Sequence, residues 1–399
     1  MNILIINHFD KLPGENFRDQ RYTFLYKKLK EKNNVTWLSS DFHHWTHKNR
    51  FIENITKEDR NNIVLIKTLS YQNNISIKRF ISHSLVSIKT FIYLLKERKK
   101  YDIMIVIAPV ENLFLSVIYS KITKTKLVID ILDLWPDLFI QAFPKKLTLF
   151  GRVILYPYHL MANYAYKKAD HITSVSKTYT KIGMSRSKRK DYQNSSYFYL
   201  GAPTQCYIYN KNKSKNKLKC LFAGQFGYNY DIEIILEVAK KFQDNKIDIE
   251  FNLAGSGFKL KYIEEYIKIN ELKNVNLLGW LDSNSLLKVA ENCHVGLNCY
   301  KKFATQSVPT KIFDYMAFGL YIINSLKDEV EEMIENEGIG VTYEVENKDD
   351  LFNKLSILMS NIDRVIENGE FNKNLFERKY TFEEIYVNMS NTILGVANA

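Results

Sequence analysis

Blocks of apolar residues alternate with amphipathic segments from the start of the chain. Residues 3–6 read as a short apolar strand, 18–31 carry apolar positions at helical spacing, and 35–38 form the next apolar run. The same succession continues, with strands expected at 63–67, 102–107 and 126–131, a helical stripe at 75–97, and a strand opening into a helix at 169–180. Strands that alternate with helices predict a doubly wound, parallel α/β sheet.

A polar, lysine- and asparagine-rich stretch at 210–217 interrupts this pattern, and the pattern then starts again. Strands are expected at 217–224, 249–257, 275–278 and 294–299, and glycines follow the first two. We therefore predict two Rossmann-like domains of the α/β class, residues 1–205 and 206–375, followed by a terminal helical segment at 376–399.

Residues 307–325 carry the clearest chemical signal in the second half. Ser307 and Pro309 are helix start signals, Gly319 ends the helix, and a buried strand follows. The first turns present Thr310, Lys311 and Asp314. A helix N-terminus and a lysine suit an anion, and a carboxylate one turn deeper suits ribose hydroxyls. A well-capped amphipathic helix with an exposed lysine explains the same pattern equally well.

Composition and charge narrow the class of protein. The 399 residues are 46% hydrophobic and 25% charged, and the four cysteines show no paired spacing, which fits a globular protein of a reducing compartment. The net charge of +12 is uneven, since residues 1–200 carry +17 and the remainder −5. The first half is therefore expected to meet an anionic partner, phosphates or an acidic membrane face. No secretory signal is recognised at residue 1, so we expect a cytoplasmic location.

Several residues of the first half are candidates for chemistry. Asp133 lies just beyond the strand at 126–131, where open α/β sheets place their ligands, although a helix N-cap explains it too. Gly14 either lets a phosphate approach the backbone or is an ordinary turn glycine, and no G-x-G-x-x-G accompanies it. Lys48 and Arg50 are candidate acceptor contacts.

The first half also raises the questions of metal binding and of contact with a membrane. His43, His44 and His47 have no carboxylate or cysteine at ligand spacing, so no metal site is expected. The helical stripe at 75–97 fits either a helix docked on a sheet or a surface that rests on a membrane, and the aromatic, basic segment at 139–166 is a candidate for an interfacial segment.

A series of motifs in the second half resembles a known family. In order, they read AGQFG, LAGSG, LLGWL and SVPTKIFDYMAFG, and LDLWPD and ADHITSVS add to the likeness in the first half. The chain resembles the GT-B glycosyltransferases of the large retaining family four, above all its bacterial O-antigen and capsule members. The resemblance implies two domains facing a cleft, a nucleotide-sugar donor held by the C-terminal domain, an acceptor held by the N-terminal domain, and a final helix that crosses back.

The resemblance also implies roles for individual residues. It places Gly224 and Gln225 at the donor phosphates, Gly255 and Gly257 at the nucleoside, Trp280 and Leu281 beside the base, Thr310 and Lys311 at the diphosphate, and Asp314 at the ribose. This chain departs from the family at two points: Gln306 stands where many members have a glutamate, and no Arg or Lys occurs within 225–230. Phosphate neutralisation then falls on Lys311, on helix dipoles, or on first-half residues such as Arg18.

The expected reaction is metal-free, cofactor-free glycosyl transfer with retention, from a nucleotide-diphosphate sugar, a UDP-sugar by preference, to a polyprenyl-diphosphate-linked or oligosaccharide acceptor. The sugar moved is a hexosyl or N-acetylhexosaminyl group for lipopolysaccharide or capsule, at the inner membrane face. Lys311 would stabilise the leaving diphosphate, and Asp133 would orient acceptor or sugar. The alternatives are a sugar-nucleotide epimerase of the same fold and a basic, non-catalytic nucleic-acid-binding protein, although no nucleic-acid motif is recognised. An oxidoreductase is disfavoured because the first unit lacks the glycine fingerprint.

Overall fold

The computed structural model describes residues 1–15, 20–44, 46–72, 76–97, 100–140, 147–189, 192–204 and 209–399. The chain divides into two units, which are described separately. Unit 1 comprises residues 1–199 and 385–399, and unit 2 comprises residues 200–384. The sequence analysis predicted the domain boundaries after residues 205 and 375.

Unit 1 is built on a parallel seven-stranded sheet in the order β5-β2-β1-β6-β7-β8-β9. Its strands are β1 (Asn2–Ile6), β2 (Asn34–Ser40), β5 (Ile63–Ile66), β6 (Ile103–Val106), β7 (Lys126–Ile131), β8 (His171–Ser174) and β9 (Ser195–Tyr197). β3 (Phe42–His43) and β4 (Lys48–Asn49) form a small antiparallel pair beside it. The chain leaves β1 in one direction and returns to its other side at β6, so the strand order reverses between these two strands.

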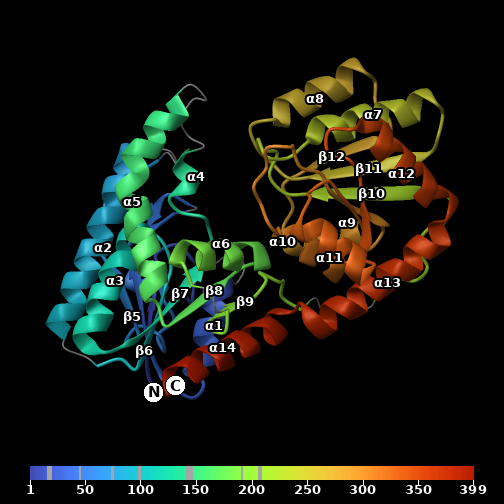
Figure 1. Ribbon diagram of the computed structural model, residues 1–399. Helices are drawn as coiled ribbons and strands as arrows, with labels where there is room; N and C mark the ends of the chain where they lie inside the picture. The colour runs from blue at the N-terminus through green and yellow to red at the C-terminus, as the bar shows by residue number, and fades with distance from the viewer. Residues whose placement is uncertain are drawn as a thin grey trace. The chain divides into compact units, whose positions relative to one another are not determined.

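Helices cover both faces of this sheet (Figure 1). They are α1 (Arg21–Lys30), α2 (Ile77–Glu97), α3 (Val110–Thr123), the short α4 (Asp137–Ile140), α5 (Thr148–Lys168), α6 (Lys177–Ser187) and α14 (Phe382–Asn398), with a 3-10 turn, η1, at Ile52–Asn54. α2, α3, α5 and α6 pack against one another in that order and form one layer. α14 packs on α1, where the Tyr386 ring meets Phe24 and Arg21.

Unit 2 repeats the doubly wound plan with a parallel six-stranded sheet in the order β12-β11-β10-β13-β14-β15. Its strands are β10 (Leu218–Ala223), β11 (Ile249–Ala254), β12 (Val275–Gly279), β13 (Val295–Asn298), β14 (Tyr321–Asn324) and β15 (Gly340–Thr342). The strand order reverses between β10 and β13. Open α/β sheets place their ligands at the carboxyl edge beside such a reversal.

The helices of unit 2 again lie in two layers (Figure 1). α7 (Ile232–Asp244), α8 (Leu260–Ile269) and α12 (Lys348–Ser360) lie on one side, and α9 (Ser283–Ala290), α10 (Thr310–Ala317), α11 (Glu329–Glu337) and α13 (Ile362–Lys379) on the other. The core between sheet and helices is apolar and aromatic, with Phe222, Phe242 and Phe251 fully buried. Two doubly wound parallel sheets confirm the predicted fold class.

Candidate functional site

A pocket of about 280 Å³ opens at the carboxyl edge of the unit 2 sheet, next to the reversal of strand order. Its wall comes from the ends of β10, β11 and β12 and from α9 and α10. The lining residues are Ala223, Gly224, Gln225, Ala254, Gly255, Ser256, Trp280, Leu281, Leu286, Lys311, Asp314, Tyr315 and Phe318. Four different connections of the sheet therefore converge on one cavity of small-ligand character.

Two glycines let the ends of β10 and β11 approach each other at the pocket. A Cβ on Gly255 would lie 1.8 Å from the Gly224 carbonyl oxygen, and Gly255 has φ +153°. A Cβ on Gly224, with φ +150°, would lie 2.7 Å from Cε of Lys311. Only glycine fits at both positions, which brings bare backbone to the pocket wall.

Lys311 is the most unusual side chain of this site. It is 9% exposed, and its Nζ has no hydrogen-bond partner among the described residues. Nζ lies 3.5 Å from the centre of the Phe222 ring and 3.8 Å from that of Tyr230, so the ammonium is held between two aromatic faces. Burial lowers the pKa of Lys311 well below its usual range, and the nearby Cys299 and Asp314 only oppose this shift. Such an amine gains a strong partner when an anion enters.

The α10 helix holds Lys311 in place through its buried face. Ile312, Phe313 and Met316 are buried in the core. The Tyr315 hydroxyl donates to the Leu297 carbonyl and accepts from the Ala223 N–H, both at 3.1 Å. This phenol therefore ties the helix to the ends of β10 and β13, the two strands at the reversal.

The pocket contains seven of the residues predicted to bind a donor, which are Gly224, Gln225, Gly255, Trp280, Leu281, Lys311 and Asp314. Gly257, Gln306 and Thr310 are not part of its wall. Gly257 instead packs closely on the backbone of Phe226, where a Cβ would lie 2.6 Å from the carbonyl oxygen. The binding roles of all ten residues stay predictions.

Sequence reasoning missed further residues of the wall, namely Ala223, Ala254, Ser256, Leu286, Tyr315 and Phe318. Ala223, Ala254 and Ser256 directly adjoin predicted glycines, so the motifs did mark their place. Tyr315 lies within the predicted helix, but its spacing gave no sign of the two hydrogen bonds.

The second unit matches a protein family by sequence. Residues 207–377 match the family model for glycosyl transferases group 1, and no curated protein shows a significant match. The fold is GT-B.

Solved GT-B structures match nearly the whole chain at low sequence identity. HepE of Anabaena, in complex with UDP, has a TM-score of 0.66 at 13% identity and covers 99% of this chain and 100% of its own. Sucrose-phosphate synthase from Thermosynechococcus elongatus gives 0.70 at 12%, covering 99% and 98%. The lipopolysaccharide outer core galactosyltransferase WaaB gives 0.65 at 15%, covering 99% of both chains. Together with the family match, the fold supports a glycosyltransferase.

The predicted first-half residues lie in unit 1 of the GT-B fold. Asp133 lies just beyond β7, and its side chain is exposed. Desolvation by the neighbouring protein atoms raises the pKa of its carboxyl group, and the positive charge of Arg79 opposes this rise. Gly14 has φ +97°, and a Cβ there would lie 2.5 Å from the Asn54 carbonyl oxygen. The lack of a side chain at Gly14 therefore allows its loop to pack closely against the backbone at Asn54. Arg18 lies outside the described residues.

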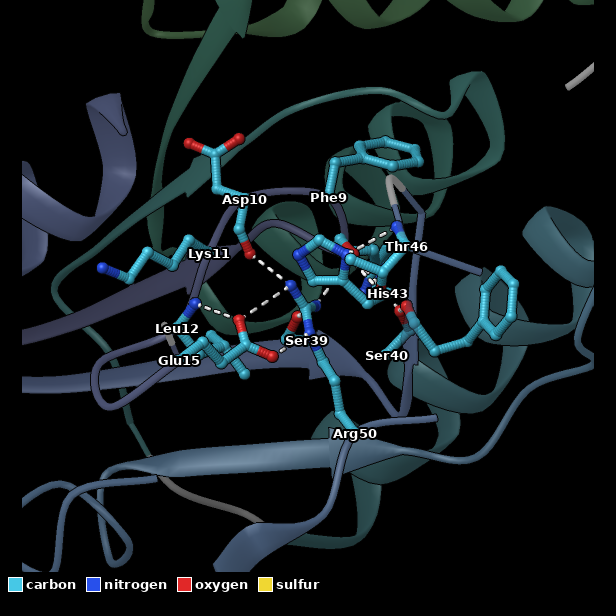
Figure 2. A network of polar contacts seen from close by, with 12 residues as sticks. Phe9, Asp10, Lys11, Leu12, Glu15, Ser39, Ser40, His43, Thr46 and Arg50 are labelled. Carbon is cyan, nitrogen blue, oxygen red and sulfur yellow. Dashed lines mark hydrogen bonds and ion pairs between the residues drawn. The ribbon is translucent and has the colours of Figure 1, made fainter. Parts of the chain in front are cut away.

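Arg50, which the sequence suggested as an acceptor contact, has a structural role in the loop after β1 (Figure 2). It is 5% exposed. Its guanidinium donates to Glu15 at 2.9 Å, to the Asp10 carbonyl at 2.6 Å and to Ser39 Oγ at 2.9 Å. Glu15 in turn accepts from the Leu12 N–H at 2.7 Å. These bonds hold residues 10–15 against β2, so the arginine is not available to a substrate.

His8, His44 and His83 are buried in the packing of unit 1. The ring of His44 bonds the Tyr71 hydroxyl at 2.6 Å, and burial lowers the pKa values of His8 and His44 to about 4 and that of His83 to about 2. Within the described part of the chain, no group of three or more His, Cys, Asp or Glu side chains could hold a metal ion.

Proposed function

We propose that this protein is a retaining glycosyltransferase of family four that moves a hexosyl or N-acetylhexosaminyl group from a UDP-sugar to a lipid-linked or saccharide acceptor. The observation that carries the proposal is the buried Nζ of Lys311, which has no hydrogen-bond partner among the described residues and lines a pocket at the reversal of strand order. A diphosphate supplies the anion that this amine lacks.

We propose that the same pocket wall also holds the other parts of a nucleotide sugar. Trp280 is 74% exposed and, with Leu281, offers a surface for the base. Asp314 lies one turn along α10 from Lys311, and we propose that its carboxylate accepts hydrogen bonds from the ribose hydroxyls. The backbone at Gly224, Gln225 and Gly255 is proposed to face the phosphates.

The chemistry proposed is departure of the UDP diphosphate while the acceptor hydroxyl attacks the same face of the sugar. Lys311 and the first-turn N–H groups of α10 stabilise the charge that develops on the diphosphate, and no metal takes part. The departing phosphate accepts the proton of the acceptor hydroxyl. Gln306 and Thr310 are proposed to contact the sugar and the diphosphate, Asp133 to orient acceptor or sugar, and Gly14, Gly257 and Arg18 to adjoin the donor.

The solved neighbours suggest the donor and the pathway. HepE has been solved with UDP and with UDP-glucose, and WaaB is described as a lipopolysaccharide galactosyltransferase. We therefore propose UDP as the nucleotide and surface polysaccharide, O-antigen or capsule, as the product, made in the cytoplasm at the inner face of the membrane. The net charge of +17 over residues 1–200 fits an anionic lipid-linked acceptor there.

A thermal-shift panel of UDP, GDP, ADP and CDP tests the donor site. UDP at about 100 times its Kd is expected to stabilise the protein by about 2.7 kcal/mol, and the other diphosphates by less. A panel in which no nucleotide raises the melting temperature would remove the proposal.

Turnover assays separate transfer from epimerisation. UDP-sugar and a polyprenyl-diphosphate sugar are incubated together and apart. Transfer requires the acceptor, whereas an epimerase changes the sugar of the donor without it, and that second result would favour the rival function.

A further inference from the structure

α5 presents an apolar stripe to solvent. Leu149 and Val153 are 75% and 67% exposed, and Tyr156 and Leu160 are also exposed. These four positions follow helical spacing, and at about 100° per residue they lie opposite the buried Leu155. Phe150 and Ile154 are also exposed, to one side of the stripe, so the apolar surface of the first turns of α5 is wider than the stripe alone.

α2 presents a second stripe of the same kind. Its exposed apolar residues are Ile77, Ile81, Ile88, Ile92 and Leu95. They lie nearly opposite the buried residues of this helix, such as Val86 and Leu94. Lys78, Lys89 and Lys96 each follow a stripe residue directly in sequence, so the lysines border the stripe along one flank.

The two helices belong to one layer of unit 1. Both pack against α3, and the Phe80 ring of α2 meets the Tyr158 ring of α5 at 5.4 Å. Figure 1 shows α2 and α5 on the same side of the unit 1 sheet. The outward stripes of both helices belong to the same helix layer of unit 1, and we call them together the α2–α5 face.

The charges on this face are almost all positive. The sequence of α5 contains no Asp or Glu, and Glu97 is the one acid within α2. Arg152 is exposed between Leu149 and Val153, and Lys167 and Lys168 end the helix. Exposed apolar side chains interleaved with lysine and arginine match the boundary between acyl chains and anionic headgroups.

We infer that the α2–α5 face is a docking surface for an anionic lipid bilayer, with Leu149, Val153 and the α2 isoleucines at the acyl boundary and Lys78 and Lys96 at the headgroups. This assignment deepens the proposed use of a lipid-linked acceptor and rests on it. Among the described helices, none is long and apolar enough to cross a membrane. The face therefore rests on the bilayer surface and does not span it.

Vesicle co-sedimentation of the full chain tests the inference. Vesicles of phosphatidylcholine with about 30% phosphatidylglycerol are compared with pure phosphatidylcholine, at low and high salt. The protein is expected to bind the anionic vesicles, and to bind less as salt rises. Equal binding to both vesicles, or none to either, would overturn the inference.

Paired variants locate the surface. Leu149→Ser with Val153→Ser, and separately Lys78→Glu with Lys96→Glu, are each expected to lower vesicle affinity by at least about tenfold. The matched controls in unit 2 are Ile269→Ser with Ile357→Ser, which are likewise exposed, and Lys261→Glu with Lys268→Glu. Controls that lose as much affinity as the α2–α5 variants would contradict the assignment.

Two further measurements distinguish a bilayer from a second copy of the chain, and the docking surface from the donor pocket. If the face holds a second copy, gel filtration shows a dimer that Leu149→Ser with Val153→Ser dissolves, and the inference fails. UDP-induced thermal shifts report on the donor pocket alone. A protein that shows the UDP shift but does not bind vesicles would refute this inference and leave the proposed function intact. A protein that binds vesicles but shows no UDP shift would refute the proposed function instead.

Discussion

Replacing Lys311 by methionine is expected to strengthen folding and weaken donor binding at the same time. Methionine has similar length and flexibility and no polar atom. Burial of an amine without a hydrogen-bond partner costs about 1–3 kcal/mol, and the two ring contacts offset about 0.5–2 kcal/mol of this when the amine is charged. The net gain for Lys311→Met is about 1 kcal/mol in the free energy of unfolding. For a unit of this size, that raises the melting temperature by about 2–4 °C.

The donor should respond in the opposite direction. A hydrogen bond from a charged group to a phosphate contributes about 1.5–3 kcal/mol, so UDP affinity is expected to fall roughly 10- to 150-fold. Isothermal titration calorimetry with UDP measures this loss, and urea unfolding followed by tryptophan fluorescence measures the stability.

The pH dependence gives a second check on the same residue. Because burial lowers the pKa of folded Lys311, the unfolded chain binds the extra proton at pH values between this lowered pKa and the ordinary lysine pKa of about 10.4, and wild-type stability rises with pH across that window. The advantage of Lys311→Met should therefore shrink between pH 7 and pH 10.

Lys259 is the matched control because it is equally buried but paired. Its Nζ donates to the Tyr230 carbonyl and to Glu233, both at 2.9 Å. Lys259→Met removes a donor from the Tyr230 carbonyl and leaves Glu233 with Lys301, 3.4 Å away, so it should destabilise unit 2 by about 1–3 kcal/mol. The reasoning is refuted if Lys311→Met destabilises the protein like Lys259→Met, or if it binds UDP with wild-type affinity.

Three other expectations follow from the geometry. Gly255→Ala places a Cβ 1.8 Å from the Gly224 carbonyl oxygen, so it should lower the free energy of unfolding by more than about 3 kcal/mol and abolish UDP binding. Gly395→Ala on α14, where a Cβ has open space, should change the stability and the UDP affinity by no more than about 1 kcal/mol each, as measured by chemical denaturation and calorimetry. Trp280→Ala should weaken UDP by about 1–3 kcal/mol in calorimetry with unchanged unfolding, since the ring is exposed, and equal affinity would place the base elsewhere. His8 and His83 have lowered pKa values of about 4 and about 2, so the unfolded state binds more protons below pH 6.5, and the free energy of unfolding should fall by about 1.4 kcal/mol for each histidine with every pH unit of acidification. Urea titrations from pH 7 to pH 4.5 that show no such slope would contradict their burial as neutral groups.

The sequence alone determined the class of the fold, because periodicity is a local property. Apolar runs of four to six residues followed by amphipathic segments required strands and helices in alternation, and this order allows little besides doubly wound sheets. Helix ends were less well determined. The terminal segment expected from 376 contains only the last residues of α13, which begins at Ile362, and then the whole of α14. α5 did not emerge as a helix, since its aromatic and apolar residues extend beyond one stripe.

The sequence also marked part of the pocket through its glycine motifs. Gly224, Gly255 and Lys311 stand at the ends of strands or the start of a helix, and parallel strands bring such ends to one edge. The sequence did not determine whether the side chain of Lys311 is buried, because the helix pattern alone fitted an exposed surface lysine equally well. Only the packing of Phe222, Tyr230 and α10 buries its amine without a hydrogen-bond partner among the described residues. Burial of a side chain depends on residues distant in sequence, so tertiary structure alone decided it.

The same division holds in unit 1. Its positive charge could be counted from the sequence, but the role of Arg50 could not. The structure places that guanidinium among Glu15, Asp10 and Ser39, because a loop, a strand end and a hairpin meet there. Likewise, the stripe of α2 was compatible with a docked helix or a free surface until the fold showed which side was already buried. Sequence determines which residues share one face of a helix, and packing determines whether that face remains in contact with solvent.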